Sequence, residues 1–394
     1  MPPPNLPFSL EEYQDRLTRT RAAMAKGQVE ALVITDPSNM AWLTGYDGWS
    51  FYVHQAVIVT MNGDPVWWGR EMDAQGARRT VWMGDDCIKG YADHYVQSKT
   101  AHPMQDLGMT LVRMHLGSVR IGVELDNYYF SARAMHTLNA SMKQASWSDA
   151  TGTINELRCV KSPAEIAFMR KAASISEIMI DGLLERVEPG VPKNEVVAEL
   201  YRDAIRGTDE AWGDYPAIVP MLPSGADAAA PHLTWDGREF ASGEATFFEI
   251  SGCYRRYHAP FCRTLFLGDP PDDLKRAEAA VVEGLEAGLE SARAGNRACD
   301  IANALHGVLE KAGIERSARC GYSIGLSYPP DWGERTVSLR ADDETVLEPG
   351  MCFHFMPGLW QDNWGLEITE SILIRQDGAA ETLCNRPRQL FVKP

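Results

Sequence analysis

The order of helix and strand patterns predicts two domains, an N-terminal α/β domain and a C-terminal α+β domain built from two similar halves. Strand and helix patterns alternate as far as about Leu138, which is typical of an α/β domain. After Val160 a different order, two helices followed by strands, occurs twice. The second helices of these repeats resemble each other, GVPKNEVVAEL from Gly190 and GNRACDIANAL from Gly295. Two related halves commonly place a site in the crevice between them, so we expect one there.

The first domain, which we place at residues 1–150, begins with a helix and continues with short strands. The pair Ser9-x-x-Glu12 forms a capping box for a helix that is closed by Gly27. An apolar run then predicts a strand at Ala31–Ile34. Two further apolar runs flank an Asn-Gly-Asp turn and therefore predict a β-hairpin, Ala56–Thr60 with Val66–Trp68.

The second domain, which we place at residues 160–394, follows a stretch with weaker periodicity. Ser162, Pro163 and Glu165 occupy the N-cap, first-turn and capping-box positions of a helix that we expect to end at Gly190. We expect the other main elements to be helices at 194–206, 272–294 and 298–311 and strands at 345–355 and 366–374.

The totals describe an ordinary globular protein and exclude several kinds of partner. The 394 residues carry a formal charge of −16, which disfavours binding to nucleic acid or to an anionic membrane. No apolar stretch is long enough to span a bilayer, and the N-terminus lacks the basic leader and apolar run of a secretion signal. The eight cysteines are scattered without a C-x-x-C pair, as expected for reduced thiols. These features predict a soluble, cytoplasmic protein.

The stretch Glu244–Thr264 carries the clearest sign of chemistry. Its apolar run Thr246–Ile250 predicts a buried strand with Glu249 in the middle. A carboxylate inside a dry strand is costly unless it is hydrogen-bonded or has a chemical task. We expect Gly252 to allow a turn that leads, through Pro260, into a second strand, which gives a hairpin with polar groups on its inner face.

Several motifs of the chain resemble the creatinase and aminopeptidase P family. The resemblance covers essentially the whole chain, and its most specific pieces are VKSPAEIAFMRKAA (Val160–Ala173), PSGADAAAPH (Pro223–His232), the hairpin Glu249–Thr264, the loop Gly321–Gly325 and VLEPGM (Val346–Met351). It implies a creatinase-like α/β domain followed by a "pita-bread" α+β domain whose halves are related by a pseudo-two-fold axis.

The peptidases of that family bind two metal ions through Asp, Asp, His, Glu and Glu side chains. At the matching positions this chain has, in order, Glu249, Pro260, Tyr322, Met356 and a position near Thr369. Proline offers no side-chain ligand, methionine offers only a soft thioether, and tyrosine is a poor substitute for imidazole. We therefore expect no metal and no cofactor, and the metal-independent, creatinase-type branch is the better match.

Within that branch, the segment Thr35–Val59 is most similar to enzymes that open the cyclic amidine of ectoine to an N-acetylated 2,4-diaminobutyrate. The resemblance implies a small zwitterionic substrate, ectoine, with hydroxyectoine left open as a second one. It also implies, as a partner, the deacetylase that acts next on the product. Hydrolysis without a metal needs a base that activates water and an acid that protonates the departing nitrogen.

Three positions are the candidates for this acid–base chemistry. His232 matches the family's catalytic histidine, so the resemblance implies a proton relay there. Glu249 can hold the cation and either activate water or attack the carbon itself, and the sequence leaves both roles open. The second carboxylate is Glu370 or, failing that, Glu367, because one of the two points outward in a strand at 366–374.

Other residues are expected to bind the substrate. Tyr322 can donate a phenolic hydrogen bond, Trp360 can stack on the planar cation, and Arg335 can hold the substrate carboxylate. His258 and His354 lie on strands that should line the crevice.

The first domain is also expected to contribute to a site. Creatinase-like enzymes are homodimers in which the N-terminal domain of one subunit completes the site of the other, and Tyr52 and His54 match the region that does so. The family's arginine in that segment is not evident, which speaks against creatine. Two alternatives remain open: a creatinase-type guanidine amidinohydrolase and a non-catalytic, peptidase-like binding module. Retention of His232 and Glu249 speaks against the binding module, which has no need of an acid–base pair.

Overall fold

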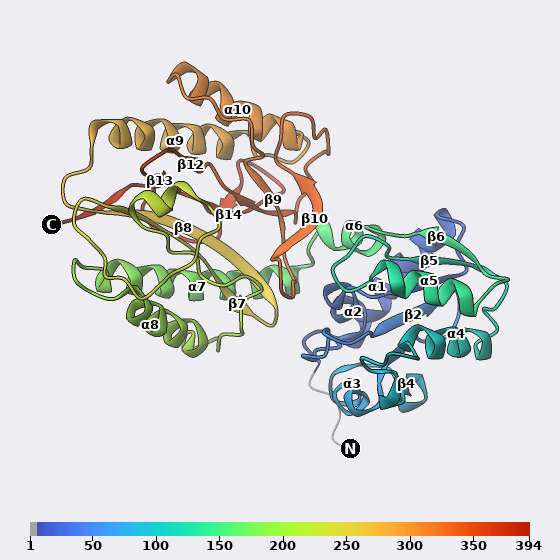
Figure 1. Cartoon of the computed structure of the whole chain (residues 1–394). Coiled ribbons are helices and arrows are strands. Elements are labelled where there is room, and N and C mark those ends of the chain that lie inside the picture. Colours follow the sequence, from blue (N-terminus) through green and yellow to red (C-terminus); the bar gives the residue numbers. More distant parts are fainter. Residues whose placement is uncertain (1–5) are drawn as a thin grey trace. The chain divides into compact units, whose positions relative to one another are not determined.

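The computed structural model describes residues 6–394 and divides the chain into two compact units (Figure 1). The first unit ends at Arg158 and the second begins at Cys159. Within the described residues, no helix is both long enough and apolar enough to cross a membrane.

The N-terminal unit is a six-stranded mixed sheet with helices on both faces. Its main elements are α1 (Leu10–Lys26), β1 (Ala31–Ile34), α2 (Pro37–Thr44), β2 (Ala56–Thr60), β3 (Val66–Arg70), α3 (Ala74–Thr80), β4 (Ile88–Tyr91), α4 (Pro103–Arg113), β5 (Arg120–Val123), α5 (Ala132–Ser141), β6 (Ser146–Asp149) and α6 (Thr153–Cys159). The strand order is β4-β3-β2-β1-β5-β6. Alternate residues of β1 enter different cores, because Leu32 and Ile34 pack with α1–α3 whereas Ala31 and Val33 pack with α4 and α5.

The local predictions for this unit are confirmed except for the capping box, of which only the Ser9 half is present, because the Glu12 carboxylate accepts from Arg16. The Ser9 hydroxyl accepts a hydrogen bond from the Glu12 amide at the start of α1, the strand Ala31–Ile34 is fully buried, and β2 pairs antiparallel with β3. Each of these features depends on residues close in sequence, which is why patterns alone could locate them.

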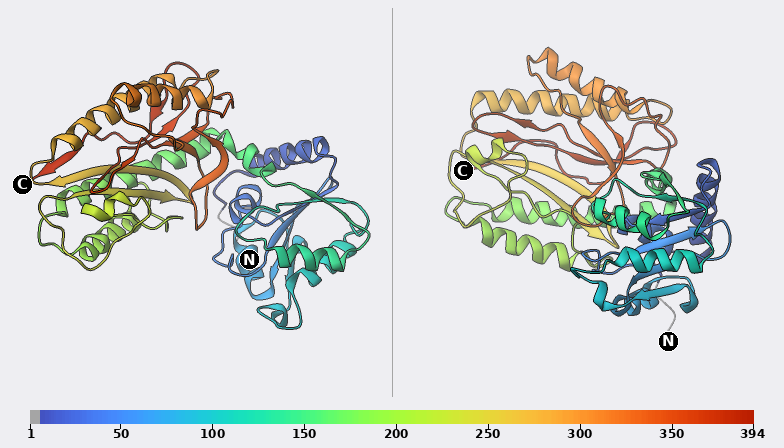
Figure 2. Two further views of the ribbon diagram at one scale, coloured as in Figure 1. Left: turned by 45° about the horizontal axis from the view of Figure 1, so that its top comes forward. Right: turned by 45° about the vertical axis from the view of Figure 1, so that its right-hand side comes forward.

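The C-terminal unit contains two strand layers between two pairs of helices. Its main elements are α7 (Pro163–Arg186), α8 (Lys193–Arg206), β7 (Ala245–Tyr254), β8 (Tyr257–Leu267), α9 (Asp272–Ser291), α10 (Ala298–Lys311), β9 (Gly321–Ile324), β10 (Gly333–Ser338), β11 (Cys352–Phe355), β12 (Leu359–Trp360), β13 (Gly365–Leu366), β14 (Glu370–Leu373), β15 (Glu381–Thr382) and β16 (Phe391–Lys393). Helices α7 and α8 cover the β7–β8 hairpin, and α9 and α10 cover the sheet β10-β9-β11-β14-β15 (Figures 1 and 2). The predicted repetition of two helices followed by strands is therefore present.

The central hairpin is longer than we expected, and the predicted turn at Gly252 is wrong. Strand β7 continues through Gly252 to Tyr254, and the chain reverses at Arg255 and Arg256, which have φ values of 49° and 67°. Gly252 serves packing instead, because a Cβ there would lie 2.2 Å from the Ala172 carbonyl oxygen on α7. The glycine allows the strand to approach the helix closely.

The strand predicted at 366–374 is interrupted. Strands β13 and β14 are separated by residues 367–369, which leave the five-stranded sheet and lie against β8. The Glu367 amide donates to the Thr264 hydroxyl at 2.8 Å, and the Thr369 amide donates to the Cys262 carbonyl at 3.2 Å. This interruption fixes where the acids at 367 and 370 point.

Candidate active site

Glu249 lies in the middle of β7 and faces the second half of its unit. The hairpin register pairs it directly with Cys262 on β8, so the two side chains are on the same face. Glu249 is 6% exposed. Its carboxylate makes no hydrogen bond within residues 6–394, and its Oε1 lies 4.0 Å from Nδ1 of His354.

Glu367 is a second buried acid on the same side of the hairpin. It is 1% exposed, and neither of its carboxylate oxygens has a hydrogen-bond partner in the described part of the chain. Burial raises the pKa of Glu367 to about 7. Burial, reinforced by the negative charge of Glu367, raises the pKa of Glu249 well above its usual range. The two acids therefore retain a proton between them near neutral pH.

A chain of hydrogen bonds runs beside these acids. The Trp332 indole N–H donates to the Tyr322 hydroxyl at 2.8 Å, and that hydroxyl lies 3.1 Å from Nδ1 of His354. Nε2 of the same imidazole lies 2.8 Å from the Thr369 hydroxyl. Burial lowers the pKa of His354 to about 3, so the ring is neutral at physiological pH. Burial also raises the pKa of Tyr322, with Glu249 adding to the effect, so the phenol keeps its proton.

These side chains come from both halves of the unit. Glu249 belongs to the hairpin of the first half, whereas Tyr322 is on β9, His354 is on β11 and Glu367 follows β13 in the second half. We call Glu249, Glu367, Tyr322, His354 and Trp332 the carboxylate site.

Two further predicted residues adjoin the carboxylate site. Trp360 packs with the apolar cluster of Met221, Phe247 and Cys262, and its indole nitrogen is buried without a partner in the described structure. Nε2 of His258 accepts a hydrogen bond from the Ala217 amide at 2.9 Å, and burial lowers its pKa to about 3. His258 therefore has a structural bond and a neutral ring.

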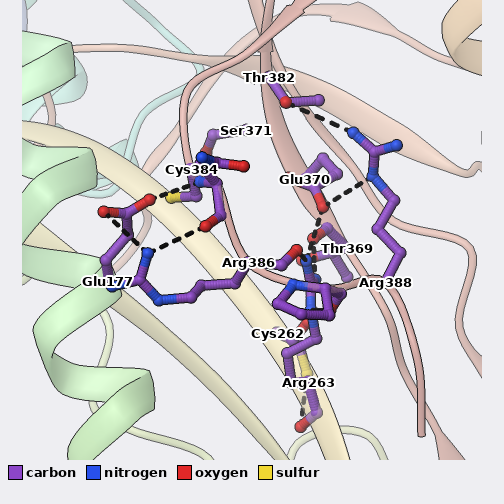
Figure 3. Close-up of polar contacts among 12 residues, drawn as sticks. Glu177, Cys262, Arg263, Thr369, Glu370, Ser371, Thr382, Cys384, Arg386 and Arg388 are labelled. Carbon is purple, nitrogen blue, oxygen red and sulfur yellow. Dashed lines mark hydrogen bonds and ion pairs between the residues drawn. The ribbon is translucent and has the colours of Figure 1, made fainter.

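Glu370 has a different environment from Glu367, although both are buried. Its Oε1 accepts hydrogen bonds from Arg263 at 2.7 Å and from Arg388 at 3.2 Å (Figure 3). Arg263 is adjacent to Cys262 on β8 and therefore projects from the opposite face of the hairpin. The geometry thus favours Glu367 as the second carboxylate of the site and gives Glu370, our first choice from sequence, an ion-pairing role.

Four other predicted residues are not part of the carboxylate site, two of them in the C-terminal unit and two in the N-terminal unit. His232 is exposed in the loop that follows the short 3₁₀ helix η4 (Gly225–Ala229), and within residues 6–394 its side chain makes no hydrogen bond or ion pair. Arg335 is exposed in the irregular strand β10, with a φ of 57°. Tyr52 and His54 belong to the N-terminal unit, where both line one pocket.

Three residues of this region escaped the sequence reasoning. Cys262 had a signal, because a hairpin turn at 255–256 places it opposite Glu249. Thr369 was noted only as an alignment position, and its bond to His354 depends on the break between β13 and β14. Trp332 carried no signal beyond being an aromatic residue in a loop.

The donor set does not fit the two metal ions that the peptidase fold accommodates elsewhere. Pro260 supplies only a carbonyl, which already accepts a hydrogen bond from the Ser371 hydroxyl at 2.7 Å. Both ring nitrogens of His354 have hydrogen-bond partners. Among residues 6–394, no three His, Cys, Asp or Glu side chains converge in an arrangement that could hold a metal ion.

Comparison with protein families defines the class of this fold. Residues 16–160 match the creatinase/prolidase N-terminal domain, and residues 167–376 match metallopeptidase family M24. The chain therefore belongs to family M24, and the resemblance seen in the sequence is confirmed.

Individual relatives refine this placement. The ectoine hydrolase of Halomonas elongata is 57% identical over 398 residues, covering 99% of each chain. An uncharacterised hydrolase/peptidase of Sinorhizobium fredii is 39% identical over 390 residues, covering 98% of this chain and 99% of that one. Among solved structures, a prolidase from Thermococcus sibiricus superimposes with a TM-score of 0.84 at 19% identity, covering 98% of this chain and all of the other. That likeness supports the fold alone.

Proposed function

We propose that this protein hydrolyses the cyclic amidine of ectoine to N-acetyl-2,4-diaminobutyrate. The observation that carries the proposal is the pair of buried carboxylates, Glu249 and Glu367, which make no hydrogen bond within residues 6–394. Buried acids without partners are costly, and a cationic ligand offsets that cost. The name of the Halomonas relative, 57% identical to this chain, supplies the kind of cation, a planar amidinium.

The charges of the site suit this substrate. Two acids that share one proton carry a net charge of about −1, which balances the single positive charge of an amidinium. Two divalent metal ions, in contrast, would need several more anionic ligands than this site offers. Trp360 provides an aromatic surface beside the site, on which a planar cation can stack.

The reaction adds the oxygen of water to the amidine carbon and breaks one of its two ring C–N bonds. Glu249 either removes a proton from the attacking water or attacks the carbon itself to form a covalent ester, which water then hydrolyses to free Glu249, and both routes give the same amide product. The departing nitrogen must receive a proton, and the one proton held by the pair can supply it. In the free protein the higher pKa of Glu249 keeps that proton on Glu249, so Glu249 acts as the base or nucleophile only after it has passed the proton to Glu367, which then donates it to the departing nitrogen. Tyr322, which keeps its proton, is available to donate a hydrogen bond to the substrate.

The decisive test is Glu249→Gln, assayed with ectoine by following the ring-opened product by NMR. Gln has the size of Glu but can neither accept a proton nor attack carbon, so turnover should fall by at least about a hundredfold. Glu239→Gln, an exposed acid before the same hairpin, is the matched control and should retain activity. A folded Glu249→Gln protein that turns ectoine over within a few-fold of wild type would refute the proposal.

Several finer features belong to the same proposal. We propose that catalysis needs no metal, because Pro260 and Met356 replace acidic ligands. We also propose a homodimer in which Tyr52 and His54 complete the partner's site, and turnover of hydroxyectoine alongside ectoine. The proposed relay through His232 requires its exposed loop to close over bound substrate. The eight free thiols support action in the reducing cytoplasm, next to the deacetylase that consumes the product.

A further inference from the structure

Arg316 lies in the connection between α10 and β9, where its side chain is half-buried. Four of the five N–H groups of its guanidinium donate to backbone carbonyls. The acceptors are Ala318 at 2.7 Å, Gly358 at 2.9 Å, and Arg319 and Met356 at 3.1 Å each. The side chain therefore joins its own connection to residues 356–358, which lie 40 or more residues further along the chain.

The two joined segments lead directly to residues of the carboxylate site. The connection enters β9, which carries Tyr322, and residues 356–358 follow β11, which carries His354. Residues 356–358 also lead into β12, which pairs with β13, and Glu367 is the next residue after β13. The Met356 amide donates to the Cys320 carbonyl at 2.6 Å and strengthens the same junction. Arg316 therefore helps to fix three site residues that come from separate strands.

No carboxylate cancels the positive charge of Arg316. Within residues 6–394 the guanidinium makes no ion pair, and the carbonyls that it contacts are neutral dipoles. A half-buried charge of this kind acts more strongly at a distance than a charge in water. Burial raises the pKa of Glu367, and the charge of Arg316 opposes this increase. Burial lowers the pKa of Arg316, and the charge of Glu367 opposes that decrease.

The other titratable groups around Glu367 and Arg316 are uncharged near neutral pH. Glu249 on β7 keeps its proton because burial and the charge of Glu367 raise its pKa. Burial also raises the pKa values of Cys262, Cys320 and Tyr322 and lowers those of His306 and His354. A second cation, Arg319, lies over the Tyr322 ring but is exposed, so solvent screens its charge. Within residues 6–394, Arg316 is thus the cation whose charge favours ionisation of Glu367.

We propose that Arg316 is a positioning residue that fixes the segments carrying Tyr322, His354 and Glu367 and makes Glu367 the anionic member of the carboxylate pair. Its role in turnover rests on the proposed hydrolysis, but the charge arrangement exists in the free protein. An anionic Glu367 attracts the amidinium of the substrate and is ready to accept the proton that Glu249 passes on. Arg316 itself has no contact with the reacting atoms in this scheme.

A titration of the free protein tests the charge directly and needs no turnover. Infrared spectroscopy follows the C=O band of protonated carboxyl groups as the pH changes, and the component that is missing in Glu367→Gln belongs to Glu367. We expect its midpoint at about pH 7 in the wild type. The midpoint should lie at least about one pH unit higher in Arg316→Gln and within about half a unit of wild type in Arg316→Lys, which keeps the charge. Lys311→Gln, an exposed lysine at the end of α10, is the matched control and should leave the midpoint unchanged.

The pH dependence of ectoine turnover gives a second measurement. If the anionic pair is the active form, kcat/KM should fall below about pH 7. Arg316→Gln should move that fall upward, so that it loses about tenfold near pH 6 and little near pH 9. A purely structural contact would instead lower kcat/KM by the same factor at every pH. Arg316→Lys should keep the wild-type pH profile, although it cannot donate in so many directions and should unfold at a lower temperature.

Two results would overturn the inference: an unchanged Glu367 midpoint in Arg316→Gln, and an equal displacement of the midpoint in Arg316→Lys and Arg316→Gln. If Arg316→Gln does not fold, Arg316→Lys carries the test, and a midpoint displaced by more than about one pH unit in the folded Lys variant would refute the role of the charge. Wild-type protein that leaves ectoine unchanged would refute the hydrolysis, whereas a displaced Glu367 midpoint in Arg316→Gln would still support the charge arrangement. Active wild-type protein with an unmoved midpoint would refute this inference alone.

Discussion

Glu367 and Glu370 differ in their hydrogen bonding, so we predict that the same substitution, Glu to Gln, changes the stability of the protein in opposite directions at the two positions. Both acids are almost completely buried, but Glu367 lacks hydrogen-bond partners within the described residues whereas Glu370 accepts from two arginines. Substituting each with Gln removes the charge and keeps the size. Glu367→Gln should stabilise the protein at about pH 8, and Glu370→Gln should destabilise it.

The expected gain in unfolding free energy for Glu367→Gln follows from the pKa of Glu367. The folded-state pKa, about 7, lies above the usual value of 4.5, so folding favours the protonated form. The stability that this provides is complete below about pH 4.5 and is lost as the pH rises through about 7. At 1.36 kcal/mol per pKa unit, the loss at pH 8 is about 3 kcal/mol. Gln cannot ionise and should recover most of it.

Glu370→Gln should have the opposite effect because it leaves Arg263 charged in the core. The Arg263 guanidinium is fully buried and donates to Glu370 at 2.7 Å. Removing one partner of a buried ion pair typically costs about 3–5 kcal/mol. Glu367→Gln should also reduce turnover by about a hundredfold, whereas Glu370→Gln should retain activity at temperatures where it is folded.

Urea unfolding at about pH 5 and about pH 8, followed by circular dichroism, measures both effects. We expect Glu367→Gln to match wild type near pH 5 and to exceed it by about 3 kcal/mol near pH 8. A Glu367→Gln protein that is less stable than wild type at pH 8 would show that this carboxylate is satisfied, and the argument for a cationic ligand would then fail.

Three further predictions concern the site and its assembly. Trp332→Phe keeps an aromatic ring but removes the indole N–H that donates to the Tyr322 hydroxyl. We expect kcat for ectoine to fall by about tenfold while KM changes by less than about threefold. A tenfold rise in KM with unchanged kcat would instead indicate a role in substrate binding. Exhaustive chelation should leave activity unchanged and added manganese or zinc should not raise it, because Pro260 and Met356 cannot supply acidic ligands; stoichiometric metal whose removal abolishes turnover would contradict this. Mixing inactive Tyr52→Ala and Glu249→Gln proteins should restore up to about a quarter of wild-type activity if subunits re-assort, since half the dimers are mixed and one of their two sites is intact; full activity in a monomeric preparation would exclude the shared site.

The sequence predicted those parts of the fold that are determined locally. Ser162 caps α7 through a capping box with Glu165, as its spacing indicated. The helix at 298–311 has the predicted limits. In each case the signal and the structure lie within a few residues, so tertiary contacts have little opportunity to override it.

The features that escaped prediction depend on contacts between distant segments. Gly252 indicated a turn, but the close approach of α7 required a glycine within a continuous strand. The choice between Glu367 and Glu370 depended on residues 367–369 pairing with β8, a register that sequence periodicity does not contain. The same interruption places Thr369 against His354. Side-chain contacts between segments that are distant in sequence can be identified only from the three-dimensional structure.

These observations explain how a peptidase fold can accommodate an organic cation. The fold still directs side chains from both halves toward Glu249, but at the positions that the family resemblance matches to metal ligands the chain has Pro260, Tyr322 and Met356. Two acids remain at the centre with one proton between them near neutral pH, because each is buried and Glu367 further disfavours ionisation of Glu249. Such a pair attracts one positive charge and can exchange one proton, which are the two requirements for opening an amidinium ring. The neutral His354 and the protonated Tyr322 add hydrogen bonds without changing that charge.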